Sequence, residues 1–172
     1  LYVRDGVPLP EKFNMFQSIL DKVKQIPGVK YCEYKIGLTK DLKKTGFFGD
    51  DVWWRGVIDL LVVDEDKKLA TIIDYKTGKS SQYADTRQLS LMGVGVFKHF
   101  PEVETIKAAL MFLVSKELIK EEYKVEKVDE MFEEWGKMIH RIDNAYDSNV
   151  FNAVPNFGCR WCPVASCAHN GK

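Results

Sequence analysis

The chain has 172 residues, of which 45% are hydrophobic and 29% charged, and its 25 basic and 25 acidic residues give a formal net charge of zero. This length and composition predict one globular domain with a substantial core. No apolar run approaches the roughly 20 residues that a membrane helix needs, so we expect no membrane span. The first residues are typical of the middle of a domain and lack the features of a signal peptide.

Net charge and cysteine content bear on the kind of ligand and on the cellular compartment. Nucleic-acid-binding proteins are often basic, so zero net charge argues against a large phosphate-binding surface but leaves room for a local groove. The four cysteines, three of them close together near the C-terminal end, do not follow the pattern of a secreted disulfide framework. We therefore expect a reducing compartment, namely the cytoplasm, or the host cytoplasm if a phage encodes the chain.

The N-terminal part of the chain predicts a loop, a helix and a strand. Residues 1–9 carry glycine and proline and are expected to form the loop. A helix is expected to begin at Glu11 or the residue before it and to end before Pro27, because apolar residues recur at helical spacing in between. Residues 30–38 alternate in part and predict a strand, in which Glu33 is, from the residues alone, compatible with a charge on an edge strand.

A charged loop with aromatic residues follows. Residues 39–51 contain several lysines and glycines, for which phosphate contact and plain solvation are both open. Four aromatic residues stand in or just after this loop, namely Phe47, Phe48, Trp53 and Trp54. Such rings stack on splayed bases or, more commonly, pack in a core.

Two apolar strands are predicted over residues 52–63 and 69–76, and the polar turn between them makes a β-hairpin. Because the centre of the turn is midway between Asp59 and Asp74, these aspartates are expected to lie roughly opposite one another, within a residue of register. Lys76 follows Asp74 by two residues, so the two side chains share a face of the strand.

These three charges, Asp59, Asp74 and Lys76, converge within strands that are otherwise apolar. Opposed like charges repel, and buried charges need a partner or a metal. A hard divalent cation would turn the repulsion into coordination, since Mg²⁺ prefers carboxylate oxygens and water. The alternative is a surface hairpin in which Lys76 pairs with Asp74, but the apolar flanks and the hairpin spacing favour the metal site.

A helix is expected from Asp85 towards Phe100, after a polar loop. Asp85 and Gln88 have the spacing of a capping box, which would give Gln88 a purely structural role. Strands are then predicted over residues 106–114 and 119–125.

The last expected helix is amphipathic and covers residues 128–146. His99 and His140 stand alone on helices and are expected to be surface or capping residues.

The C-terminal segment carries Cys159, Cys162 and Cys167 in a C-x2-C-x4-C pattern, which is close metal-ligand spacing. Three thiolates need a fourth ligand, which His169 would supply for zinc and a distant cysteine for an iron–sulfur cluster. The remaining cysteine, Cys32, lies in a predicted core strand and is expected to pack there.

Two segments together resemble a known signature. They are residues 56–59, Gly-Val-Ile-Asp, and residues 73–78, Ile-Asp-Tyr-Lys-Thr-Gly. They resemble the PD-(D/E)xK nuclease superfamily, and the pattern G-x-x-D followed by D-Y-K-T-G is similar to its RecB-like branch. Within that branch the best resemblance is to phage-type RecB-like exonucleases, and it extends over the whole chain.

The resemblance implies roles for the residues of the hairpin. Asp59, Asp74 and the backbone carbonyl of Tyr75 would bind Mg²⁺ or Mn²⁺. Lys76 would orient or help to deprotonate the attacking water and neutralise charge in the transition state.

Other residues would assist. The resemblance implies auxiliary catalytic roles for Glu33 and Gln88. Contact with the nucleic acid is expected from Arg87, Lys79 and Trp54.

Several RecB-like nucleases hold a four-iron cluster with one cysteine from an N-terminal helix and three from a C-terminal motif like residues 157–172. They also carry a metal-binding histidine on a helix near the N-terminus. Neither helix appears before Leu1, so we expect residues 1–172 to lack these N-terminal helices, either because they are a fragment or processed form or because this member does not have them. A full-length form would carry a [4Fe–4S] cluster, with zinc as the alternative, and residues 1–172 would hold it incompletely or not at all.

We expect an α/β fold with a restriction-endonuclease-like core, in which a mixed β-sheet is flanked by helices. Residues 1–172 would form a single nuclease domain with a Cys-rich C-terminal segment, residues 157–172. The expected function is metal-dependent hydrolysis of phosphodiester bonds in DNA, by an exonuclease acting on single strands or duplex ends in recombination, repair or replication. The alternative is a catalytically idle DNA-binding or scaffold module that keeps the fold.

Overall fold

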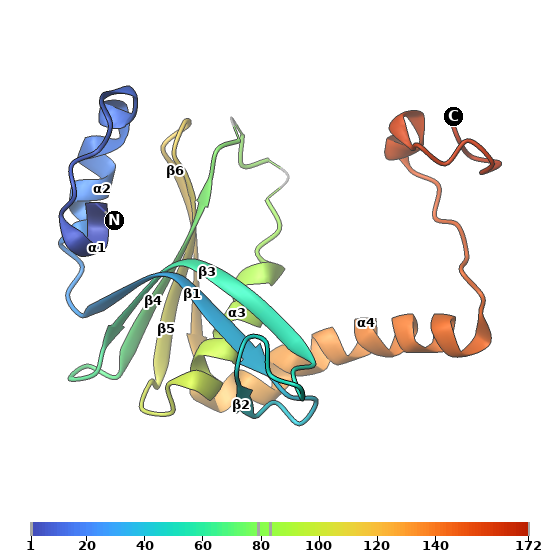
Figure 1. The fold of residues 1–172 in the computed structure, drawn as a ribbon, viewed down its shortest axis with the longest axis horizontal. Coiled ribbons are helices and arrows are strands. Elements are labelled where there is room, and N and C mark those ends of the chain that lie inside the picture. The colour runs from blue at the N-terminus through green and yellow to red at the C-terminus, as the bar shows by residue number, and fades with distance from the viewer. Residues whose placement is uncertain (1, 79, 83, 172) are drawn as a thin grey trace. The chain divides into compact units, whose positions relative to one another are not determined.

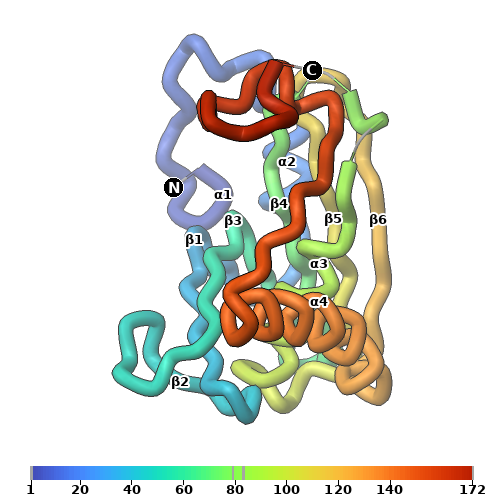
Figure 2. Tube along the Cα trace, turned by 90° about the vertical axis from the view of Figure 1, so that its right-hand side faces the viewer, coloured from blue at the N-terminus to red at the C-terminus, as the bar shows by residue number. Residues whose placement is uncertain are grey.

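The computed structural model describes residues 2–78, 80–82 and 84–171. The chain divides into two compact units, Leu1–Trp135 and Gly136–Lys172. The first unit is built on a six-stranded sheet with the strand order β2-β1-β3-β4-β5-β6 (Figures 1 and 2). Strands β4 and β5 are parallel and the other neighbouring pairs are antiparallel, so the expected mixed sheet is confirmed.

The elements follow in chain order. The strands are β1 (Val29–Leu38), β2 (Lys44–Thr45), β3 (Trp54–Asp64), β4 (Leu69–Lys76), β5 (Thr105–Phe112) and β6 (Glu117–Lys124). The helices are α1 (Tyr2–Asp5), α2 (Gln17–Lys24), α3 (Arg87–His99) and α4 (Val128–Ser148), with 3-10 turns at Glu11–Phe16, Val125–Lys127 and Phe157–Trp161. None of the described helices is long and apolar enough to cross a membrane.

The β3–β4 hairpin forms where the sequence predicts it. Its turn is held by Asp64, whose carboxylate accepts a hydrogen bond from the Lys67 backbone N–H at 3.3 Å and contacts the Lys67 ammonium at 3.0 Å. Lys68 closes the turn with a φ of 49°, in the left-handed region that tight turns use. The register that follows pairs Asp64 with Leu69 and Leu60 with Ile73.

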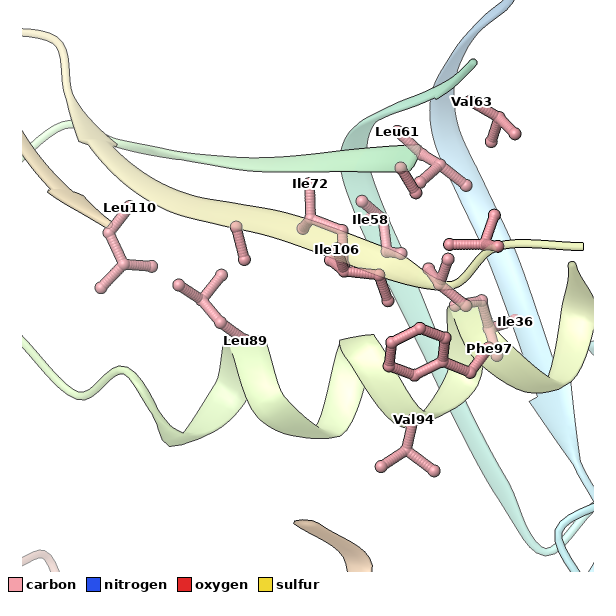
Figure 3. Close-up of a cluster of buried hydrophobic side chains, with 14 of the residues drawn as sticks. Ile36, Ile58, Leu61, Val63, Ile72, Leu89, Val94, Phe97, Ile106 and Leu110 are labelled. Carbon is pink, nitrogen blue, oxygen red and sulfur yellow. The ribbon is translucent and has the colours of Figure 1, made fainter. Parts of the chain in front are cut away.

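The main core lies between the sheet and α3 (Figure 3). Branched and aromatic side chains from alternate strand positions meet one face of this helix, because successive residues of a strand point to opposite faces of the sheet. The side chains labelled in Figure 3 are Ile36, Ile58, Leu61, Val63, Ile72, Leu89, Val94, Phe97, Ile106 and Leu110. Met131 and Phe132 from the first turns of α4 pack against the same core.

The second core lies on the opposite face of the sheet. Its buried residues are Val3, Val23, Leu60, Val62, Ile73 and Met111, from α1, α2 and three strands. Helices therefore cover both faces, as expected.

One expectation for the N-terminus is wrong, because residues 2–5 are helical and do not form a loop. Tyr2 is hydrogen-bonded to Asp21 and to Gln17, and Val3 is buried in the second core. These tertiary contacts order the segment, and local sequence does not reveal them.

The second unit, Gly136–Lys172, contains the rest of α4, an extended stretch and the cysteine-rich segment. Asn156 caps the Phe157–Trp161 turn by accepting a hydrogen bond from the Gly158 N–H at 2.8 Å. Further backbone bonds close the segment, including Gly171 N–H to the Cys159 carbonyl at 3.0 Å and Asn170 N–H to the Cys167 carbonyl at 3.0 Å.

Candidate active site

Strands β3 and β4 separate at the position where the sequence places two aspartates. The ladder ends at the pair Leu60 and Ile73, and the next register position would set Asp59 opposite Asp74. At that point the Asp59 carboxylate replaces the ladder bond, because its Oδ2 accepts a hydrogen bond from the Tyr75 backbone N–H at 2.8 Å. One Asp59 oxygen is therefore held against the main chain directly after Asp74.

The β1–β3 ladder is disturbed at the same level. It pairs Cys32 with Leu60 and Tyr34 with Ile58, so Glu33 takes the register position opposite Asp59. Glu33 has a φ of 54°, in the left-handed region. A non-glycine residue there carries a strain of about 1–3 kcal/mol and is held by its surroundings.

This disturbance reverses the alternation of side chains in both strands. Cys32 and Leu60 point into the second core, while Tyr34 and Ile58 point into the main core. Glu33, between Cys32 and Tyr34, is left exposed. Acidic residues of β1, β3 and β4 therefore share one level of the sheet.

Lys76 and Gln88 complete the group around Asp74. The Lys76 ammonium lies 2.7 Å from Asp74 Oδ2 and donates a hydrogen bond to Gln88 Oε1 at 3.3 Å. The aspartate is buried, with 8% of the residue exposed. Beta-strand parity places Lys76 on the same side as Asp74, as predicted, and α3 brings Gln88 to them.

Two buried atoms of this group lack hydrogen-bond partners among the described residues, namely Asp74 Oδ2 and Gln88 Nε2. The Lys76 ammonium is close enough to Asp74 Oδ2 for an ion pair, but its direction is wrong for a hydrogen bond, so the contact is Coulombic. The buried acceptor, Asp74 Oδ2, could bind a cation, and the buried donor, Gln88 Nε2, could donate to an oxyanion or a water. The group is thus incomplete by itself.

The predicted capping box at the start of α3 is wrong. Thr86 is the N-cap residue, and Asp85 instead accepts a hydrogen bond from the Arg87 N–H at 3.0 Å. The helix therefore begins a residue later than expected, which places Gln88 in the second position of the helix. Its amide is not used by a cap and meets Lys76.

Arg87 is exposed and already has a partner in Asp85. Its guanidinium lies 2.5 Å from Asp85 Oδ2. The hydrogen bonds from Arg87 lower the pKa of Asp85 to about 2. Lys79, the other expected phosphate contact in this region, lies outside the described residues.

A hollow of about 260 Å³ lies beside Lys76 and Gln88. Its lining is Lys76, Ser80, Ala84, Asp85, Gln88, Leu110 and Phe112. A larger groove of about 740 Å³ lies between α2 and strands β4 to β6 and is lined by none of the candidate site residues. The larger groove is therefore not the candidate active site. The smaller hollow is the chemically relevant one, because it is lined by Lys76 and by Gln88, whose Nε2 lacks a hydrogen-bond partner among the described residues.

The donors present fit a hard divalent cation. Mg²⁺ is commonly held by one or two carboxylates together with waters and substrate phosphates. Asp59 has one oxygen that the Tyr75 N–H does not use, and Asp74 has a buried oxygen without a hydrogen-bond donor. The part of the chain that the structure describes holds no group of three or more His, Cys, Asp or Glu side chains placed around a metal, so the fit rests on these two aspartates.

Tyr75 is fixed from both sides of β4. Its N–H donates to Asp59, and its ring packs in the second core. Burial raises the pKa of the phenol well above its usual range, and the nearby Cys32 and Asp59 act in the same direction. The phenol therefore stays protonated, and any metal contact would come from the backbone, as the resemblance implies.

Trp54 is half-buried and packs against the main core. A Cβ placed on Gly56 would lie 3.1 Å from Trp54 Cζ2, so the glycine of the G-x-x-D segment makes room for the indole. The expected contact of Trp54 with nucleic acid stays a prediction.

The cysteines of the C-terminal segment are free, and among the described residues they form no group of three ligands around a point. Asn156 N–H contacts Cys159 Sγ at 3.4 Å, and backbone bonds close the surrounding turns. Ligation of iron–sulfur or zinc by Cys159, Cys162 and Cys167 therefore stays a prediction. Cys32 lies within the second core, as expected.

Sequence reasoning missed two features. His99 is buried, where a surface or capping position was the expectation, and its Nε2 lies 2.9 Å from the Gly37 carbonyl oxygen while its Nδ1 lies 3.2 Å from the Tyr34 hydroxyl. The left-handed conformation of Glu33 is the second. Neither has a local signal, because each depends on strands brought together from distant parts of the chain.

Comparison with known proteins agrees with this geometry. A family model described as the PD-(D/E)XK nuclease superfamily matches residues 13–167, which include every candidate residue of the active site. No curated protein matches the chain.

Proposed function

Because the chain belongs to the PD-(D/E)XK nuclease superfamily, we propose that it is a deoxyribonuclease that depends on Mg²⁺ or Mn²⁺. The observation that supports this most is the convergence of Asp59, Asp74, Lys76 and Gln88 where β3 and β4 separate. A buried Asp74 oxygen without a hydrogen-bond donor is the atom that a cation would satisfy. The G-x-x-D and D-Y-K-T-G segments favour the RecB-like branch, of the phage type.

The chain's own residues would divide the work. Asp59 and Asp74 hold the cation, with the Tyr75 carbonyl as a further oxygen ligand. When bound, Mg²⁺ or Mn²⁺ supplies positive charge at the reacting phosphate and makes the attacking water more acidic. Lys76 orients that water or helps to deprotonate it, and its positive charge neutralises the negative charge that develops on the phosphate.

Gln88 and Glu33 assist from either side. The unpartnered Gln88 Nε2 can donate to a phosphate oxygen or to the attacking water, and its Oε1 holds Lys76 in place. Glu33 adds a carboxylate on the side of β1. Arg87 becomes a phosphate ligand only when its guanidinium leaves Asp85. These roles are weaker than those of the aspartates, because neither Glu33 nor Arg87 is buried.

We propose that the activity is exonucleolytic and serves DNA recombination, repair or replication. Residues 1–172 would form one nuclease domain with a cysteine-rich C-terminal segment. The specific alternative is a catalytically idle DNA-binding or scaffold module. One observation favours it, since the Lys76 ammonium lies 2.7 Å from Asp74 Oδ2 and can neutralise this carboxylate as a structural ion pair.

Digestion of matched DNA substrates separates these possibilities. The wild-type protein is incubated with covalently closed circular DNA, the same DNA linearised, and a labelled single strand, each with Mg²⁺, Mn²⁺, Ca²⁺ or a chelator. An exonuclease degrades the linear and single-stranded forms with Mg²⁺ or Mn²⁺ and spares the circle. Loss of the circle would show an endonuclease, and DNA binding without any degradation would establish the idle module.

A further inference from the structure

Two cations and two phenylalanines form an exposed cluster on β1, β3 and the loop between β2 and β3. We call this set, Lys35, Phe47, Phe48 and Arg55, the cation–aromatic patch. The Lys35 Nζ lies 5.5 Å from the Phe47 ring centroid and 5.8 Å from that of Phe48. The Arg55 guanidinium carbon lies 5.5 Å and 5.4 Å from the same two centroids. The rings themselves meet edge to face, with centroids 4.8 Å apart.

The loop is shaped to lie over the strands. A turn closed by the Gly49 N–H and the Gly46 carbonyl at 2.9 Å carries both phenylalanines. A Cβ on Gly37 would lie only 2.6 Å from the Gly46 carbonyl oxygen, so this close approach of loop and strand requires glycine. Thr45 donates a hydrogen bond to Asp51 at 2.5 Å across the base of the loop. The patch is thus held by backbone contacts as well as by its rings.

Both the aromatic and the cationic side chains of the patch reach solvent. Phe48 is 76% exposed, which is unusual for a large apolar ring. Lys35 and Arg55 are exposed, and within the described residues neither has a carboxylate at ion-pair distance. Flat apolar surface beside unpaired positive charge fits a ligand that offers flat rings and negative charge together. Single-stranded nucleic acid has this chemistry, since its bases stack on aromatic rings and its phosphates attract cations.

The position of the patch relates it to the candidate active site. Lys35 lies two residues along β1 from Glu33, and Arg55 lies four residues along β3 from Asp59. At a rise of about 3.3 Å per residue, these separations are about 7 and 13 Å along the strands. Because Tyr34, Ile36 and Trp54 pack against the main core, alternation turns Lys35 and Arg55 to the other face of the sheet, so the patch is a surface distinct from the catalytic group.

We propose that the cation–aromatic patch is a stacking platform for unpaired bases of a DNA strand whose phosphates lie against Lys35 and Arg55. This rests on the proposed function for its ligand class and assigns a substrate-binding surface outside the catalytic group. Phe48 provides the stacking face, and Phe47 supports it edge to face. The two cations draw in the backbone and, by sitting over the rings, keep them in place.

Binding of base-containing and abasic oligonucleotides tests the platform without any catalysis. Fluorescein-labelled oligothymidine and an abasic oligonucleotide of equal length are titrated with protein in chelator, and binding is followed by fluorescence anisotropy. Phe48→Ala should weaken oligothymidine binding about fivefold or more and leave abasic binding unchanged, since one aromatic stack is lost. Phe48→Trp should retain binding. Lys35→Gln with Arg55→Gln should weaken both ligands, more at low salt.

The matched control is Phe13→Ala. Phe13 is also an exposed phenylalanine with a lysine over its ring, Lys12 at 5.0 Å, but it belongs to the Glu11–Phe16 turn and not to the patch. Its removal should leave both affinities unchanged. Melting curves of each variant establish that the fold is intact.

Four results would overturn the platform proposal. Phe48→Ala could lose affinity equally for both oligonucleotides, or lose no affinity for either. Phe13→Ala could lose as much oligothymidine affinity as Phe48→Ala, or the wild type could fail to bind oligothymidine more tightly than the abasic oligonucleotide. If the patch binds only a polypeptide, the wild type shows no base-dependent binding, and the platform is refuted. Failure of the proposed function looks different. If the wild-type protein digests no DNA yet binds oligothymidine through Phe48, the nuclease proposal is refuted and the platform proposal stands. If the protein is an active nuclease whose oligothymidine binding does not depend on Phe48, the platform proposal is refuted and the nuclease proposal stands.

Discussion

Two regions of this chain have residues at the spacing of metal ligands, but the fold brings the side chains together in only one of them. At the separation of β3 and β4, Asp59 and Asp74 come from strands whose register is set by a buried core. In the C-terminal segment, Cys159, Cys162 and Cys167 follow one another within one short stretch, and among the described residues no three ligands converge there.

The difference lies in what remains unsatisfied. In the sheet, packing forces charged groups together and leaves Asp74 Oδ2, which is ion-paired with Lys76, and Gln88 Nε2 buried without hydrogen-bond partners among the described residues. In the C-terminal segment, the chain satisfies its own turns through backbone bonds such as Gly171 to Cys159. On the proposed function, the site built by long-range register would exist before its metal is bound, whereas the short cysteine motif, with little buried surface, would depend on a metal to assemble it. Five predictions test this contrast, beginning with the largest effect.

Asp74→Asn should lower Mg²⁺-dependent DNA digestion by about 10³-fold or more, because it removes a charged ligand from the metal site. The free energy of unfolding should change by no more than about 1 kcal/mol, since the attraction lost to Lys76 is offset by repulsion relieved at Asp59. Digestion rates and denaturant titrations measure both. Asp66→Asn, in the turn of the same hairpin, is the control and should remain fully active.

Lys76→Met should lower digestion by about 10²-fold to 10³-fold while leaving metal binding in place, because the ammonium acts on the water and the phosphate. The measurement is kcat at saturating Mg²⁺, with Lys67→Met in the hairpin turn as control. Full activity of Lys76→Met would mean that the Lys76–Asp74 pair is structural only.

Glu33→Gly should raise the free energy of unfolding by about 1 kcal/mol, because glycine adopts the left-handed conformation without strain. Digestion should fall about tenfold if the carboxylate takes part in the site. Glu33→Gln keeps the strain and removes the charge, so it should lower activity without raising stability. A gain in stability with unchanged activity in Glu33→Gly would confine Glu33 to a structural role.

His99 makes the stability of the sheet unit depend on pH. Burial lowers the pKa of His99, so the unfolded chain takes up a proton more readily than the folded one. Its contribution is present above the unfolded pKa of about 6.5 and is lost as the pH falls from there towards the folded pKa. Wild-type protein should therefore lose up to about 1 kcal/mol more stability than His99→Gln between about pH 7 and 5.5.

The smallest effect is expected in the C-terminal segment. Replacing Cys159, Cys162 and Cys167 together by serine should change the free energy of unfolding by less than about 0.5 kcal/mol and leave digestion unchanged. The contrast between the two regions would be contradicted if the wild-type protein held stoichiometric zinc or iron and the triple variant lost both this metal and much of its stability. That result would instead show that the cysteines form a structural site.

The same contrast explains how far the sequence could predict the molecule. The bounds of β4 and the hairpin followed from apolar runs around a polar turn, and the placing of Asp59 and Asp74 at one register position, just beyond the last ladder pair, followed from the position of that turn. These are local patterns that the core then enforces. The start of α3 was misplaced because Asp85 has two possible uses, as a cap or as a partner of Arg87, and tertiary context decides between them.

What could not be predicted depends on distant strands. Glu33 is left-handed because β1 and β3 change faces together at Glu33 and Asp59. The cation–aromatic patch requires a loop to fold back over Lys35 and Arg55, although its aromatic residues were visible in the sequence.

The central claim is that the two aspartates form a metal site before any metal or DNA arrives. Binding of Mn²⁺ to the DNA-free protein, followed by electron paramagnetic resonance of the free ion, tests it without relying on activity. Wild-type protein and Asp66→Asn should show the same saturable site, and Asp59→Asn and Asp74→Asn should each lose it. Equal Mn²⁺ binding by all four proteins, or no saturable binding by the wild type, would contradict the account.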